Sequence, residues 1–131
     1  MQNILENSAG ILLLLLLIIT FVQSSLEKIT DWKGNISWLR EHFSGTFMQH
    51  IIPFSVALIL ALEIIAGVLC IWGVFDIALY NDRACAFYGA VLCSFTLLLL
   101  LFGQRIARDY DGARGIVIYL IPSVFAVYLL Q

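Results

Sequence analysis

The feature that most constrains this chain is a stretch of 18 residues, 9–26, that holds no charged side chain. Residues 11–19 within it are all isoleucine or leucine. About 20 apolar residues in a helix cross the hydrocarbon core of a bilayer, so this stretch is long enough to span it. A secretory signal would begin with basic residues, and none precedes this run. We therefore expect a retained transmembrane helix, closed by Glu27 and Lys28.

Three further apolar segments follow, at residues 51–75, 84–102 and 116–130. Hydrophobic residues make up 62% of the chain and charged residues 12%, about half the charged share of a soluble domain. A soluble fold of 131 residues could not bury so much apolar surface, so lipid must be the solvent for much of it. No linker-like segment divides residues 1–131. The sequence predicts one all-α integral membrane domain, a bundle of four transmembrane helices.

Residues 32–48 have a different pattern, with charged and polar residues between regularly spaced apolar ones. The apolar residues recur at three- and four-residue steps: Trp32, Ile36, Leu39, Phe43 and Phe47. This spacing is typical of an amphipathic helix, here too polar to span a bilayer. We expect an interfacial helix on the membrane surface between the first two spans. Docking on a soluble partner fits less well, because the neighbouring segments are embedded.

Basic residues lie almost entirely in the first and third predicted loops. Six of the seven lysines and arginines fall there: Lys28, Lys33, Arg40, Arg105, Arg108 and Arg114. The opposite side has only Arg83. By the positive-inside rule, loops one and three face the cytoplasm and both termini face outward. No basic cluster is interleaved with aromatic residues on a polar surface, so nucleic acid is not an expected partner.

Glu63 is the residue that most suggests function. It lies near the middle of the second predicted span, where an ionised carboxylate costs several kcal/mol. It must be protonated, paired, or turned toward a polar cavity. One interpretation is a carboxyl that handles protons or contacts a ligand. The other is a structural glutamic acid hydrogen-bonded to a neighbouring helix, with four candidate partners: Ser94, Thr96, Tyr119 and Ser123.

The third loop, residues 103–115, supplies a second candidate site, since it mixes arginines with carboxylates and a phenol. Glu27 and Lys28 leave the first span on the same side of the membrane. Donors from this group could hold an anionic headgroup or a quinone ring. A salt-bridged loop that only anchors helix ends is the simpler alternative. The candidates taken from these segments are Glu27, Lys28, Gln104, Arg105, Asp109 and Tyr110.

The remaining residue types exclude several classes of site. Cys70, Cys85 and Cys93 form no CxxC pair, and we expect free buried thiols rather than a disulfide between Cys70 and Cys85. His42 and His50 have no partner that would indicate a metal, and we interpret them as interfacial or solvated. No phosphate loop or nucleophile motif occurs. We therefore expect no metal site, no catalytic residue, and no cofactor held by this chain alone beyond a quinone or a lipid.

Three segments, in order, resemble the DoxX family of small bacterial membrane proteins. Residues 25–31, Ser-Leu-Glu-Lys-Ile-Thr-Asp, resemble the family's Gly-(x)-Glu-Lys ending of the first span, with Ser25 where the family often has glycine. Residues 62–69, Leu-Glu-Ile-Ile-Ala-Gly-Val-Leu, are similar to its Glu-x-x-(small)-Gly stretch. Residues 109–113, Asp-Tyr-Asp-Gly-Ala, are similar to its Asp-Tyr-x-Gly-Ala region.

The resemblance implies a four-helix protein of the bacterial inner membrane. Related proteins occur as subunits of thiosulfate:quinone oxidoreductase or beside other membrane-associated redox proteins. We expect a redox-linked, quinone-proximal anchor or accessory subunit that is not catalytic on its own and works with other membrane subunits. Two alternatives stay open. One is a purely structural or assembly subunit, with helix contacts at the alanine pairs 57/61 and 86/90. The other is a small transporter or lipid-binding protein.

Overall fold

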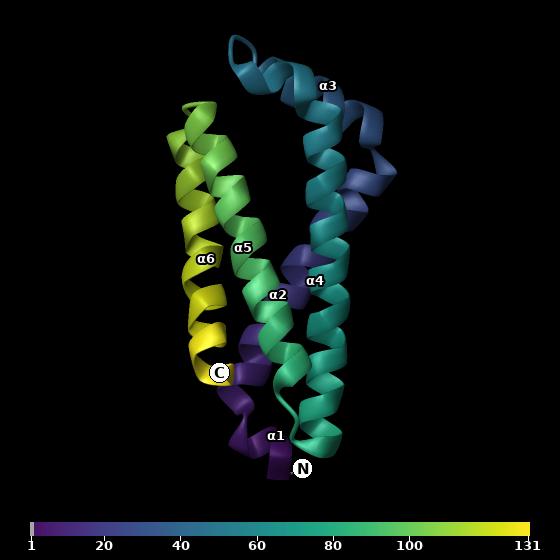
Figure 1. The fold of residues 1–131 in the computed structure, drawn as a ribbon, viewed down its shortest axis with the longest axis vertical. Helices are drawn as coiled ribbons and strands as arrows, with labels where there is room; N and C mark the ends of the chain where they lie inside the picture. Colours follow the sequence, from purple (N-terminus) through teal and green to yellow (C-terminus); the bar gives the residue numbers. More distant parts are fainter. Residues whose placement is uncertain (1) are drawn as a thin grey trace.

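The computed structural model describes residues 2–131, and within them the chain is helical with no strand. Four helices are long and apolar enough to cross a membrane, which confirms the predicted all-α bundle of four spans. Figure 1 shows them side by side, with α3 across one end. The elements in chain order are α1 (Gln2–Glu6), α2 (Ser8–Thr30), α3 (Trp32–His42), the 3-10 helix η1 (Phe47–Ile51), α4 (Ile52–Tyr80), α5 (Ala84–Ile106) and α6 (Tyr110–Leu130).

The spanning helices extend beyond their predicted ends. The second continues to Tyr80 rather than 75, and the fourth begins at Tyr110 rather than 116. Most of the predicted loop 103–115 is therefore helical, and only a short turn joins α5 to α6. Asp109 caps α6, because its carboxylate accepts a 2.9 Å hydrogen bond from the Gly112 backbone N–H. The charged residues of segment 103–115 therefore lie mostly on helical turns beyond the apolar parts of α5 and α6, and they do not end these helices.

Small residues bring α4 and α5 into close contact. Ala86 and Ala90 are fully buried, as the sequence predicts. A Cβ on Gly73 would lie only 2.5 Å from the Ala86 Cα, so glycine is what allows this approach. Ala57 and Ala61 are exposed, so the prediction of a helix contact there is wrong. Their side of α4 faces away from the bundle, which residue type alone does not reveal.

The bundle has an apolar interior and an apolar exterior. Leu14 and Leu17 of α2 are buried with two cysteines, Cys70 and Cys93, whose Sγ atoms lie 3.7 Å apart. All three cysteines are free, as predicted, but Cys85 is only half-buried, so the prediction of burial is wrong for that residue. Large side chains such as Phe95 are about half exposed. An exterior of this kind suits lipid and would be unstable in water.

The two ends of the bundle differ in charge. Helix α1 and the C-terminus lie toward the end away from α3 (Figure 1). Arg83 is at that end, where its guanidinium donates to the Leu129 carbonyl at 3.4 Å. At the other end, His42 of α3 contacts Gln104 of α5. The first and third loops therefore share one end, as four spans require.

The amphipathic helix ends earlier than predicted and packs against its own bundle. It stops at His42, short of residue 48, and Gly45 follows with φ +82°. That left-handed conformation favours glycine and cannot continue a right-handed helix. Ile36 of α3 is buried with Ile52 and Val56 of α4. The apolar face of α3 thus closes one end of the bundle and forms part of the site.

Candidate functional site

A buried ion pair joins α2 to α4. Glu63 is 2% exposed, and the Lys28 Nζ lies 3.1 Å from its Oε1 and 3.3 Å from its Oε2. Two hydroxyls lie against the carboxylate. Ser24 donates to Oε1 at 3.1 Å, and Ser25 shares its one proton between the Phe21 carbonyl at 2.8 Å and Oε2 at 3.4 Å. Lys28 also donates to the Ser24 Oγ at 2.7 Å. The carboxylate is therefore both hydrogen-bonded and charge-compensated.

The partners expected for Glu63 from the sequence are wrong. Ser94 and Ser123 instead bond each other across α5 and α6 at 2.8 Å. The Thr96 hydroxyl donates to a backbone carbonyl of its own helix, and Tyr119 lies at the exposed surface. Glu63 faces α2, and it lies level with the last two turns of α2 rather than with that helix's middle. Both the partners of Glu63 and its level along α2 depend on how α2 and α4 are staggered and rotated against each other.

The Lys28 ammonium has all three of its protons engaged, by Ser24 and the two oxygens of Glu63. It lies in the last turn of α2, where the helix dipole favours a positive charge. The pair has no net charge, and each member lowers the cost of burying the other. Removing one partner would leave an uncompensated charge close to lipid.

A second cluster forms around His42, at the end of α3. Its Nε2 lies 3.1 Å from the Gln104 Oε1 and 3.4 Å from the Asp109 Oδ2. The Gln104 oxygen accepts in this contact, so Nε2 is the donor, and the Asp109 carboxylate lies beside the same nitrogen. Trp38 stacks on the imidazole at 4.7 Å between ring centroids. His42 therefore fastens α3 to the α5–α6 turn, a role that no sequence pattern signalled.

The other predicted site residues lie apart from both clusters. Arg105 and Tyr110 form a cation–π contact, with 5.1 Å from the guanidinium carbon to the ring centroid, and both are exposed. The Glu27 side chain is exposed as well, and its backbone carbonyl accepts a bond from Asn35. The structure thus brings together Lys28 with Glu63, and Gln104 with Asp109. It separates them from Glu27, Arg105 and Tyr110.

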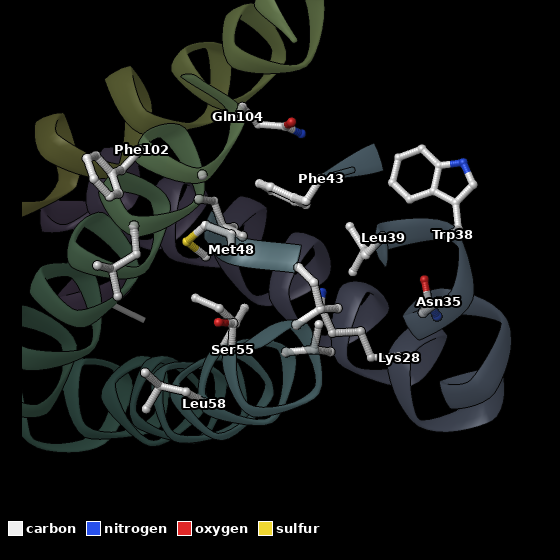
Figure 2. A pocket seen from close by; sticks show the side chains of 16 residues that line it. Lys28, Asn35, Trp38, Leu39, Phe43, Met48, Ser55, Leu58, Phe102 and Gln104 are labelled. Carbon is white, nitrogen blue, oxygen red and sulfur yellow. The ribbon is translucent and has the colours of Figure 1, made fainter. Parts of the chain in front are cut away.

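A pocket of about 340 Å³ lies between α3, α4 and α5, and Lys28 and Gln104 both line it. Figure 2 shows side chains from α3 and from the α4 and α5 ends around it. Ligand sites usually span about 300–1,000 Å³, with mostly apolar walls and a few polar groups. Here the polar lining groups are Lys28, Asn35, Ser55 and Gln104, and the rest is apolar apart from the Trp38 N–H. The ion pair and the His42 cluster therefore flank one cavity.

The pocket reaches the outer surface of the bundle. Leu58 and Phe102, which line it, are 47% and 61% exposed on α4 and α5. Their outward faces belong to the surface that contacts lipid. A molecule could therefore enter sideways from the bilayer, with its polar end near α3 and an apolar tail between α4 and α5.

Comparison of the chain with protein-family models, curated proteins and solved structures gives no match. The resemblance to the DoxX family accordingly stays a prediction from residues 25–31, 62–69 and 109–113. Among residues 2–131, no group of three or more metal-binding side chains gathers. What the site offers chemically is a small amphiphilic cavity beside a neutralised ion pair.

Proposed function

We propose that this chain is a redox-linked membrane subunit that holds a quinone headgroup for an oxidoreductase complex. The observation that carries the proposal is the pocket between α3, α4 and α5, lined by Lys28 and Gln104. It has the size and mixed lining of a headgroup site, and it opens toward lipid, where quinones reside. The resemblance of the chain to the DoxX family supports the redox context.

In this proposal this chain binds the quinone, and the cofactor that reduces it belongs to another chain. Reduction of a quinone to a quinol takes two electrons and two protons. The electrons come from a flavin, haem or iron–sulfur centre on a partner subunit, and the protons come from water at the α3 end of the bundle. This chain fixes the headgroup, with Ser55 and Gln104 among the polar groups of the wall, and its outer helix faces contact lipid and partner helices. Its contribution is position and exclusion of water.

We also propose an orientation in a bacterial inner membrane. The end that carries α3 and the α5–α6 turn holds six of the seven basic side chains and faces the cytoplasm. Both termini then face outward. A reporter fused after Gln131 is expected to be active only outside the cytoplasm, and activity only in the cytoplasm would refute the orientation.

The test combines purification with a variant that fills the pocket. The tagged chain, extracted from its native membrane in mild detergent, is expected to bring down a cofactor-bearing partner that mass spectrometry identifies. Ser55→Leu places a larger side chain in the cavity and should strongly reduce quinone reduction by the assembled complex. The matched control is Ala61→Leu, which places a leucine at an exposed position of α4.

The outcomes distinguish a quinone-binding subunit from a structural subunit and from a lipid-binding protein. Loss of quinone reduction in Ser55→Leu, but not in Ala61→Leu, with both complexes assembled, supports the proposal. Normal quinone reduction in both variants refutes it and indicates a structural subunit. Recovery of the chain without any cofactor-bearing partner contradicts the redox role and leaves lipid binding as the use of the pocket.

A further inference from the structure

The pocket contains one charged side chain, and that charge is already neutralised. Lys28 is the only acidic or basic residue among those that line the cavity. Its ammonium donates to both oxygens of Glu63, which lies behind it, and to Ser24. A ligand in the pocket therefore meets a compensated ion pair rather than a free cation.

We infer that the pocket selects uncharged headgroups and that Glu63 determines this selectivity. The inference rests on the proposed function in one respect, namely that the pocket is a ligand site. An anionic headgroup would have to compete with Glu63 for the Lys28 protons. Like charges repel strongly where little water screens them, and Glu63 is 2% exposed. Glu63 therefore opposes anions at a site where a lone lysine would attract them.

Uncharged headgroups have suitable partners in the same pocket. Among residues 2–131 the Ser55 hydroxyl makes no side-chain hydrogen bond, so it can donate or accept. The Asn35 amide nitrogen is held by the carbonyls of Glu27 and Asp31, at 3.2 and 2.9 Å, which leaves its oxygen as an acceptor. The Ser55 hydroxyl suits a hydroxyl or a carbonyl oxygen of a ligand, whereas the Asn35 oxygen suits only a hydroxyl.

The lateral opening adds the second requirement, an apolar tail. The cavity is too small for a long-chain molecule, while exposed Leu58 and Phe102 mark a path from it to the lipid-facing surface. The ligand class is therefore an uncharged hydroxyl- or carbonyl-bearing headgroup on a long apolar chain. Quinones and neutral lipids share this chemistry, and the experiment separates them.

The experiment measures competition in nanodiscs of zwitterionic lipid that hold the purified chain. The probe is an uncharged photoreactive long-chain alcohol, and bound probe is quantified on the protein after illumination. The competitors are an unlabelled alcohol and the alkylsulfonate of the same chain length, which stays ionised at every working pH. In the native chain, the alcohol is expected to compete at least about tenfold better than the sulfonate, equivalent to about 1.4 kcal/mol.

Replacement of Glu63 should change this preference. Glu63→Gln keeps the shape and frees the Lys28 charge, so the sulfonate should gain at least about tenfold relative to the alcohol. The double variant Lys28→Met with Glu63→Gln should restore the preference for alcohol, because no charge remains. The control Glu41→Gln removes a carboxylate that is exposed on α3 and does not line the pocket. It should behave as the native chain does.

The outcomes keep this inference distinct from the redox proposal. Equal competition by alcohol and sulfonate in the native chain, or an unchanged preference in Glu63→Gln, overturns the inference. If Glu63→Gln does not fold, Lys28→Met is compared with the double variant, because the two differ only at position 63. Weaker competition by the sulfonate in Lys28→Met supports the role of Glu63, and equal competition in both contradicts it. Alcohol preference together with failure of an excess of ubiquinone to displace the probe supports the inference and refutes the quinone proposal.

Discussion

Replacing Lys28 and replacing Glu63 should lower the stability of the protein by very different amounts, although both break the same ion pair. Lys28→Met leaves Glu63, which is 2% exposed, with only the Ser24 and Ser25 hydroxyls around it. Glu63→Gln leaves Lys28, whose side chain is 18% exposed and lies near the end of α2. A lysine there can turn its ammonium toward the interface, whereas the glutamate cannot leave the helix contact.

The magnitudes follow from that geometry. Removing one partner of a fully buried ion pair costs about 3–5 kcal/mol, and the exposure of Lys28 places Lys28→Met near the lower end, at about 3 kcal/mol. Glu63→Gln keeps an amide that can still accept from Lys28 and Ser25, so the loss is that of weakened hydrogen bonds, about 1–2 kcal/mol. Replacing the pair by apolar residues, Lys28→Met with Glu63→Leu, should be close to neutral or stabilising.

Thermal unfolding in detergent, followed by the fluorescence of the three tryptophans, measures the order of these variants. We expect Lys28→Met to melt lowest, Glu63→Gln next, and the apolar double variant near the native chain. A control, Lys33→Met, removes an exposed lysine of α3 and should change little. A Glu63→Gln variant as unstable as Lys28→Met, or a double variant as unstable as either single one, would refute the asymmetry and the burial on which it depends.

Other substitutions probe the helix contacts. Gly73→Ala should lower stability by about 1–3 kcal/mol, because its Cβ would clash with the α5 backbone; Gly115→Ala, with open space around it, should be neutral or stabilising. His42→Ala removes the bond between α3 and the α5–α6 turn, and faster hydrogen exchange should appear in α3 while α4 stays protected. Cys85, which is half-buried, should react with a maleimide before the two fully buried cysteines do, and equal rates would contradict their placement.

Hydropathy predicts the spans but not how they fit together. The four apolar segments could be read from the chain because a bilayer-crossing helix is a local property of about 20 residues. The partner of Glu63 could not, since it depends on how α2 and α4 are staggered and rotated against each other. Lys28 and Glu63 are both predicted site residues, yet their separation of 35 residues in the chain does not indicate that they form an ion pair.

Two other features had no adequate signal in the sequence. His42 is one histidine among polar residues, and its role appears only when α3 folds back onto the α5–α6 turn. The segment 103–115 looked like a loop because it is rich in charge, but α5 and α6 continue through most of it beyond the apolar core. The pocket itself is lined by residues of α2, α3, η1, α4 and α5, and therefore emerges only from their packing.

The central claim is that the pocket beside the Lys28–Glu63 pair holds the headgroup of a membrane amphiphile. A photoreactive ubiquinone analogue, added to native membranes and mapped by peptide mass spectrometry, tests it most directly. We predict crosslinks within segments 35–59 and 99–104, which contain nearly all the residues that line the pocket, and the loss of these crosslinks in excess unlabelled ubiquinone. Crosslinks spread evenly over the lipid-facing helices, or unaffected by the competitor, would contradict the account.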